Sequence, residues 1–300
     1  MAIEKTSSET ESPGAAIRDM VVLLDTGPST VRGAEGAGLG PAPALALDLA
    51  ARLGAHVEAV ALAVDPIVPG FVVAPLPIEV IEQARAQAID AAKAATTRFG
   101  DAATARGVAS EARVAEILMG GAPDGFVASC RTTDLVVIGQ DDPDHPEPMR
   151  ETMIESALFE GGAPVLLVPY VDKGPLALER VTIAWDGGRA AARAVHAALP
   201  FLARADKISV LMIGKASSMP GEPGADIATW LSRHGLDVVV ETMEAPEISV
   251  ADALLDHAAD KSIDLLVMGG YGHSRVREFL LGGATRGILA SMTIPVLMAH

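Results

Sequence analysis

Short apolar runs recur along this chain and alternate with longer segments in which apolar residues follow helical spacing. Three of the runs are Met20–Leu24, Leu135–Ile138 and Leu265–Met268. Uninterrupted apolar runs of about four to eight residues are typical of strands that are buried on both faces of a parallel sheet. Strands that alternate with helices also imply right-handed crossovers between parallel neighbours. The pattern therefore predicts an α/β fold with doubly wound parallel sheets.

The order of the predicted elements occurs twice along the chain. The first part has predicted strands near 20–24, 56–64, 108–114, 135–138 and 163–169, and helices near 44–53, 78–105, 124–131 and 151–160. The second part has predicted strands near 180–185, 208–213, 236–241, 264–268 and 294–298, and helices near 189–203, 225–234, 250–261 and 283–291. We therefore predict two tandem five-stranded domains, residues 19–172 and 178–300, after a polar tail, residues 1–18, that is disordered.

Composition narrows the classes of function. The formal net charge of −16 disfavours binding to nucleic acid or to an anionic membrane, both of which need clustered Lys and Arg. Cys130 is the sole cysteine, so neither an intrachain disulfide nor a thiolate metal cluster is expected. No apolar run approaches the length of a membrane span, and the polar first residues do not resemble a signal peptide. We therefore expect a cytoplasmic protein with no nucleic-acid or membrane partner.

A glycine-rich stretch near the end of the chain is the strongest candidate for a binding site. Gly269 ends a predicted strand, and Gly283 begins a predicted helix after a loop with further glycines. Glycine lets a backbone come close to phosphate oxygens, and a helix N-terminus offers N–H groups to them. If the first and fourth strands of this domain are neighbours, Asp186 faces the same crevice as Gly269. The alternative is that the glycines only permit tight loops and that Asp186 caps the following helix.

This stretch resembles the ATP-binding motif of the universal stress protein family, which is Gly-x-x-Gly, nine residues, Gly, then Ser or Thr. Here Gly269, Gly272 and Gly282 stand at that spacing, and Ala184–Gly187 resembles the ending of the family's first strand. The order of strands and helices over both domains is similar to that of tandem members of the family. The resemblance implies a Rossmann-like fold, related to that of adenine nucleotide alpha hydrolases. It also implies that the last strands of the two domains, at 164–169 and 295–298, pair to form an internal pseudo-dimer.

The resemblance also implies a ligand and its contacts. Asp186 would lie at the adenosine of ATP, Ile213 against the adenine, and Met268 with Gly269 along the pocket. The ribose and phosphates would lie among the remaining candidates, which are Gly272, His273, Gly282, Gly283, Ala284 and Thr285. Gly283 departs from the motif, because it stands where the family's Ser or Thr hydroxyl would meet phosphate. The departure removes a charge-assisted hydrogen bond of about 1.5–3 kcal/mol, although Thr285 offers another hydroxyl nearby.

The first domain departs further from the motif. No second glycine follows Gly139 at the motif spacing, and the loop at 140–147 contains four acidic residues, which would repel phosphate. These acids and His145 are also candidate metal ligands, although the prolines among them favour a solvated loop. We therefore expect no ATP in the first domain.

The composition, the motif and the family resemblance leave three candidate functions. The leading hypothesis is a stress-response sensor or regulator whose second domain binds ATP, with or without Mg²⁺, and which pairs with a regulatory protein or with itself. The alternative is an interaction scaffold of the same fold that binds no nucleotide. A weak ATP hydrolase is disfavoured, since the chain has no P-loop lysine and no recognisable catalytic base.

Overall fold

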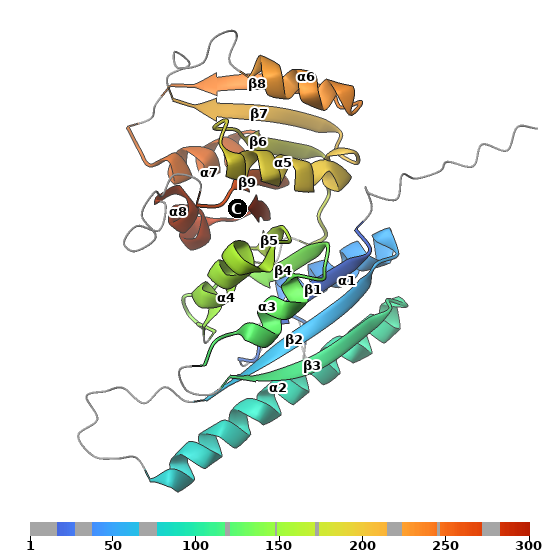
Figure 1. Cartoon of the computed structure of the whole chain (residues 1–300), viewed down its shortest axis with the longest axis vertical. Coiled ribbons are helices and arrows are strands. Elements are labelled where there is room, and N and C mark those ends of the chain that lie inside the picture. The colour runs from blue at the N-terminus through green and yellow to red at the C-terminus, as the bar shows by residue number, and fades with distance from the viewer. Residues whose placement is uncertain are drawn as a thin grey trace, which may run out of the picture.

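The computed structural model describes residues 17–27, 38–65, 77–117, 121–147, 149–171, 174–214, 224–244, 247–271 and 283–300 (Figure 1). Its strands and helices alternate along the chain. The first half contains β1 (Asp19–Leu24), α1 (Pro41–Leu53), β2 (His56–Val64), α2 (Ile78–Arg106), β3 (Ser110–Ile117), α3 (Asp124–Cys130), β4 (Leu135–Gly139), α4 (Arg150–Ser156), the π-helical turn η1 (Ala157–Gly161) and β5 (Val165–Val168). The second half contains β6 (Arg180–Ala184), α5 (Arg189–Leu202), β7 (Lys207–Ile213), α6 (Ala225–Arg233), β8 (Val238–Met243), α7 (Val250–Asp260), β9 (Leu265–Gly269), α8 (Gly283–Ser291) and β10 (Val296–Ala299).

These strands form one ten-stranded sheet in the order β3-β2-β1-β4-β5-β10-β9-β6-β7-β8. Each half contributes five neighbouring strands, and within each half every pair is parallel. The two halves meet where β5 and β10 pair antiparallel, with Leu166 opposite Leu297. The predicted α/β class, the parallel strands and the pairing of the two last strands are therefore confirmed, and the two predicted sheets are continuous.

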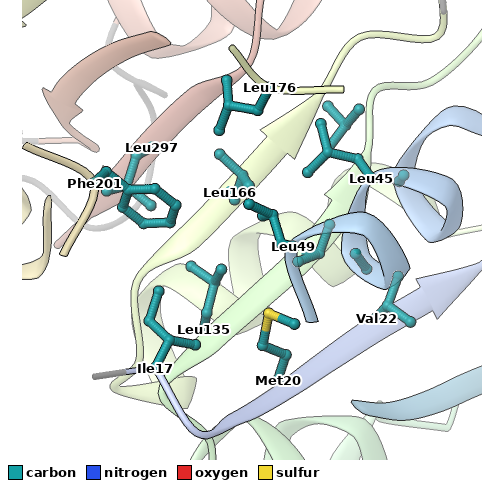
Figure 2. Packing of buried hydrophobic residues seen from close by; sticks show 14 of the residues in the cluster. Ile17, Met20, Val22, Leu45, Leu49, Leu135, Leu166, Leu176, Phe201 and Leu297 are labelled. Carbon is teal, nitrogen blue, oxygen red and sulfur yellow. The ribbon is translucent and has the colours of Figure 1, made fainter. Parts of the chain in front are cut away.

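Helices cover both faces of this sheet. The central strands direct apolar side chains to both faces, so each face is buried by a layer of helices. In β1, Met20 and Val22 face the layer that contains α1, α2, α5 and α6, whereas Val21 and Leu23 face α3, α4, α7 and α8. The first layer continues across the junction of the halves, as Figure 2 shows with Leu45 of α1, Leu166 of β5 and Phe201 of α5. Phe201 of α5 and Leu166 of β5 belong to the same cluster, so the halves share one core.

Some predicted boundaries are wrong. The predicted disordered tail extends too far, because Ile17 is buried and the N–H of Arg18 donates to Asp134 (2.8 Å); the rest of the tail lies outside the described residues. The edge strands β3 and β8 begin and end two to three residues later than predicted, at Ser110–Ile117 and Val238–Met243. Both lie at the rim of the sheet, where half-exposed side chains weaken the apolar pattern that marks a buried strand.

Within the described residues, no helix is both long enough and apolar enough to cross a membrane.

Candidate functional site

The candidate site of the second half lies at the carboxyl ends of β6 and β9. These strands are parallel neighbours, with Ala184 opposite Met268. From β6 the chain proceeds outward to β7 and β8, whereas β9 and β10 lie on the other side, so the strand order reverses between β6 and β9. Ligands of open parallel sheets bind at such a reversal, beyond the strand ends. Asp186 and Gly269 therefore lie at the same edge of the sheet, where the strands end. The sequence predicted that they face one crevice if these two strands are neighbours, and the strands are neighbours.

Gly269 has a packing role at this edge. A Cβ atom at this position would lie 2.6 Å from the backbone nitrogen of Ala191 and 2.9 Å from the Cβ of Ala190, in the first turn of α5. Real Cβ atoms essentially never lie this close to backbone atoms. The N-terminus of α5 therefore approaches the end of β9 closely, and only glycine leaves room for it.

Asp186 forms the turn that leads into the same helix. Its Oδ1 accepts the N–H of Gly188 (2.7 Å), the residue before α5. Asp186 is exposed, so its carboxylate is at the surface of the crevice while it orders the turn. The sequence alternative that Asp186 caps the helix is not observed, because the N-cap of α5 is Gly188 and has no side-chain cap hydrogen bond. The turn contact that Asp186 does make is compatible with a ligand contact, because a carboxylate accepts several hydrogen bonds.

Thr285 lies beneath the edge of the site. Its side chain is buried, and its hydroxyl oxygen accepts the N–H of Tyr271 (3.1 Å). Tyr271 is also buried and has a φ of 54°, in the left-handed region that bulky residues rarely adopt. This hydroxyl therefore holds the backbone that follows β9, and its predicted contact with phosphate stays a prediction.

The other predicted site residues fall into three groups. Ile213 and Met268 end or nearly end their strands, and both pack against the core cluster on the α7 and α8 face. Ala284 is half-buried in the first turn of α8, and Gly283 is exposed, with open space where a Cβ would be. Gly272, His273 and Gly282 lie outside the described residues.

In the first half, the equivalent crevice is closed by its own side chains. β1 and β4 are parallel neighbours, and Asp25 and Gly139 stand at their carboxyl ends, as Asp186 and Gly269 do in the second half. A guanidinium nitrogen of Arg150, the first residue of α4, pairs with Asp25. Glu147 accepts hydrogen bonds from the N–H of Gly27 (2.6 Å) and the hydroxyl of Thr26 (3.1 Å).

The space that remains beside these groups is small. The cavity lined by Asp25, Glu147 and Arg150 has a volume of about 90 Å³, whereas pockets for drug-sized ligands span roughly 300–1,000 Å³. Sequence reasoning based the expected absence of ATP in this domain on the missing second glycine and the acidic loop, and it missed Arg150. A signal was present in its position, because Arg150 begins the helix that corresponds to α8, where the second half has Gly283.

The acidic loop of the first half uses its carboxylates locally. Oδ1 of Asp142 accepts the N–H of Asp144 (3.0 Å), and Oδ1 of Asp141 accepts the N–H of Glu147 (2.9 Å). Over the described ranges, no three or more His, Cys, Asp or Glu residues are arranged to hold a metal ion.

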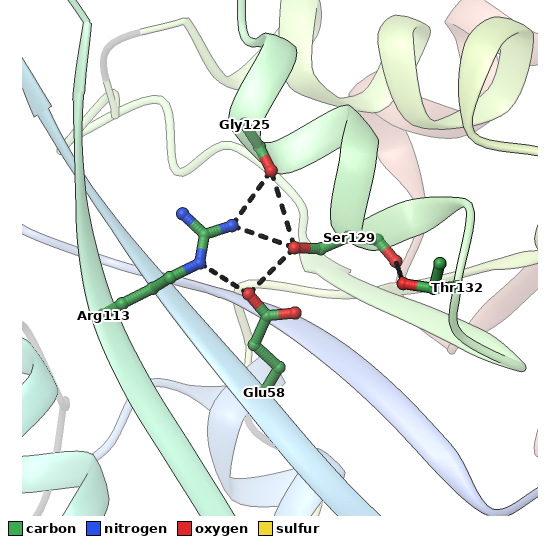
Figure 3. Close-up of polar contacts among 5 residues, drawn as sticks. All are labelled: Glu58, Arg113, Gly125, Ser129 and Thr132. Atoms are coloured by element: carbon green, nitrogen blue, oxygen red, sulfur yellow. Dashed lines mark hydrogen bonds and ion pairs between the residues drawn. The ribbon is translucent and has the colours of Figure 1, made fainter.

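A second polar cluster in the first half fastens α3 to the sheet (Figure 3). Arg113 of β3 donates from Nε to Glu58 of β2 (2.6 Å) and from Nη2 to the hydroxyl of Ser129 (2.9 Å) and the carbonyl of Gly125 (2.9 Å). The neighbouring Cys130 is fully buried, and burial raises the pKa of its thiol to about 12. A thiol that stays protonated is a poor nucleophile. We therefore assign a structural role to Cys130 and to the polar cluster beside it.

Comparisons with known proteins agree with this geometry. Residues 177–300 match the model of the universal stress protein family. The universal stress protein Slr1230 of Synechocystis sp. is 29% identical over 128 residues, a match that covers 40% of this chain and 42% of that protein. The chain thus spans less than half the length of this relative.

Solved structures share the fold over nearly the whole chain. A universal stress protein from Archaeoglobus fulgidus has a TM-score of 0.60 and 15% identity, covering 93% of this chain and 95% of the other. A putative universal stress protein from Pseudomonas aeruginosa UCBPP-PA14 has a TM-score of 0.52 and 16% identity, covering 94% and 93%. At these identities the likeness concerns the fold of both halves. The edge at the carboxyl ends of β6 and β9 falls within residues 177–300, the part of this chain that matches the universal stress protein family model.

Proposed function

We propose that the second half binds an adenine nucleotide, ATP with or without Mg²⁺, and that the protein acts in the cytoplasm as a sensor or regulator in the response to stress. The observation that supports this most directly is the adjacency of β6 and β9, which brings Asp186 beside Gly269 at the reversal of strand order. The N-terminus of α8 follows in the same domain and supplies N–H groups suited to phosphate. The glycines at the motif spacing lie between them in sequence.

The first half takes no nucleotide in this proposal. Its equivalent of Asp186 is engaged by Arg150, and the space at its crevice is too small for ATP. ATP therefore binds with a stoichiometry of one per chain.

ATP is expected to raise the melting temperature of the protein. A ligand that binds only the folded state at a concentration 100-fold above its Kd stabilises that state by about 2.7 kcal/mol. Gly272→Arg should abolish the increase, because a long side chain replaces the glycine that the motif requires.

Asp25→Asn in the closed first-half crevice is the matched control for Asp186→Asn in the second half. The expectation is that ATP still shifts the control variant and shifts Asp186→Asn less. An unchanged melting temperature at millimolar ATP in the wild-type protein would overturn the proposal.

Gly283→Ser is expected to strengthen ATP binding. Gly283 is exposed and has open space at its Cβ, so a serine fits without displacing neighbours. The added hydroxyl restores a charge-assisted hydrogen bond of about 1.5–3 kcal/mol, which corresponds to tenfold or more in Kd. Isothermal titration calorimetry measures the change, and Gly283→Ala is the control that adds a side chain without a hydroxyl. Equal affinity for both variants would show that no phosphate lies at this position.

An interaction scaffold is the competing function. It is favoured by Gly283 in place of the motif's hydroxyl residue and by the closed crevice of the first half. Mass analysis of small molecules retained through purification separates the two functions, since a scaffold yields no nucleotide. A scaffold would also keep its protein partner after Gly272→Arg.

A further inference from the structure

We propose that Phe159, in the first half, is a positioning residue for the nucleotide site of the second half. This inference rests on the proposed function and assigns to the first half, which takes no nucleotide in that proposal, a part in binding at the other domain. The contacts that connect the two halves at this point involve the end of α4 with η1, the backbone that follows β9, and the end of β10.

Phe159 covers the residue that follows the two glycines at the end of β9. Its ring lies 4.8 Å from the ring of Tyr271 and 4.7 Å, edge on, from the ring of His300, measured between centroids. Such tilted and edge-to-face arrangements are the favoured geometries of aromatic pairs. Phe159 is itself 47% exposed, whereas Tyr271 is only 6% exposed. Phe159 is therefore half-buried at the surface, and its ring contributes to the cover of Tyr271.

The backbone beside this aromatic cluster is fixed by hydrogen bonds from the second half. The N–H of Gly270 donates to the carbonyl of Ala299 (2.9 Å), and Nδ1 of His300 donates to the carbonyl of Gly270 (3.0 Å). Methyl groups of Leu158, next to Phe159, lie within contact distance of the position of a Cβ at Gly270. Gly270 is thus held between β10 and η1, one from each half.

Tyr271 is held in an unfavourable backbone conformation by the same set of contacts. Its φ of 54° costs on the order of 1–2 kcal/mol for a residue other than glycine. The hydrogen bond from its N–H to Thr285 connects the end of β9 with the first turn of α8. These two elements border the segment that contains Gly272 and Gly282, so the position of Tyr271 sets where that segment begins relative to α8.

The electrostatic surroundings of Tyr271 also come from the first half. Burial and, to a smaller extent, Glu155 and Glu151 of α4 raise the pKa of Tyr271 to about 12, while Arg286 of α8 opposes them. Nη2 of Arg286 lies 3.6 Å from Oε1 of Glu151. Both side chains are exposed, so this ion pair contributes little to stability. The tyrosine is therefore a spectroscopic reporter of the contact with Phe159, because its pKa depends on being covered.

Sequence reasoning had no signal for this role. Phe159 falls in a segment predicted as an ordinary helix, and its partner Tyr271 stands 112 positions later in the chain. The contact exists because the antiparallel pairing of β5 with β10 brings η1 beside the end of β9.

The test uses the full chain with Tyr170→Phe, so that Tyr271 is the sole tyrosine. Phe159→Ala is expected to weaken ATP binding about tenfold, a change of about 1.4 kcal/mol, and to lower the pKa of Tyr271 in an ultraviolet titration. Phe159→Trp keeps an aromatic ring that does not titrate and should restore both values. Phe159→Leu keeps apolar volume without a ring and should fall between them. Ile78→Ala, which removes a more exposed apolar side chain from α2 at the rim of the first half, is the control and should change neither value.

The outcomes separate this inference from the proposed function. Absence of ATP binding in the wild-type chain overturns the proposed function, and with it the positioning role. Wild-type binding that Phe159→Ala leaves unchanged, while the pKa of Tyr271 falls, overturns the positioning role alone. Tenfold weaker binding in Phe159→Ala that is absent in Phe159→Trp, with an unaltered urea midpoint, supports it, because a purely structural loss would also move the midpoint.

Discussion

Asp25→Ala is expected to destabilise the protein by about 3–5 kcal/mol, the usual cost of removing one partner of a buried ion pair. Arg150 is only 3% exposed, and within the described part of the chain only Nη2 of its three nitrogens has a hydrogen-bond partner, which is Asp25. Without Asp25 a full positive charge would remain buried with no acceptor. Nε and Nη1 have no hydrogen-bond partner among the described residues, so no other contact of Arg150 compensates for the loss of Asp25. Urea unfolding followed by circular dichroism measures the change.

Two variants control this prediction. Arg150→Met removes the charge but keeps an apolar chain of similar length, so it should cost much less than Asp25→Ala. Asp186→Ala removes the equivalent aspartate of the second half, which is exposed and whose Oδ1 accepts the N–H of Gly188. Its expected cost is about 1 kcal/mol, the value of a lost turn or cap hydrogen bond. Similar costs for Asp25→Ala and Asp186→Ala would mean that Arg150 relaxes into water.

The two halves share one strand order but have different residues beyond the ends of their first and fourth strands. In both, an aspartate follows the first strand and a glycine ends the fourth. The residue that begins the next helix differs, since it is Arg150 in the first half and Gly283 in the second. The arginine reaches back to its aspartate, whereas glycine has no side chain with which to do so. The residue at this helix start is thus one difference between the two candidate sites.

The sequence was sufficient for the fold because the central strands are unbroken apolar runs. Met20–Leu24 and Leu265–Met268 are buried on both faces, and such runs have few alternatives to a parallel sheet. The neighbouring positions of Asp186 and Gly269 followed from that order alone. The edge strands β3 and β8 were placed less well, because their half-exposed residues lack the same signal.

Details of the candidate site could not be predicted, since they depend on contacts between residues far apart in the chain. Arg150 lies 125 positions from Asp25. The approach of α5 to Gly269 and the cover that Phe159 gives to Tyr271 likewise depend on how helices pack onto the sheet. Glycine spacing indicated that a backbone or a ligand comes close, without distinguishing which. At Gly269 it is the backbone of α5.

Gly269→Ala is expected to destabilise the protein by about 2–3 kcal/mol, because the added methyl group would overlap the backbone of α5. The nearest atoms are the nitrogen of Ala191 and the carbonyl carbon of Ala190, which cannot rotate away as a flexible side chain would. The helix must therefore shift as a unit. Because Asp186 is bonded to Gly188 at the start of α5, the shift also displaces the carboxylate proposed to meet adenosine. ATP should consequently raise the melting temperature of this variant less than that of the wild-type protein.

Gly100→Ala makes the same chemical change where no neighbour obstructs it. Gly100 lies inside α2, and nothing outside its own helix backbone is within 4 Å of its Cβ position. Alanine there should stabilise the protein by about 0.5–1 kcal/mol, through lower backbone entropy of the unfolded chain. The two substitutions therefore have opposite expected signs in urea unfolding, and ATP should affect Gly100→Ala as it affects the wild type. If Gly269→Ala instead proves as stable as Gly100→Ala, α5 has room to move at the end of β9. In that case the glycine at this position is required by the ligand and not by packing.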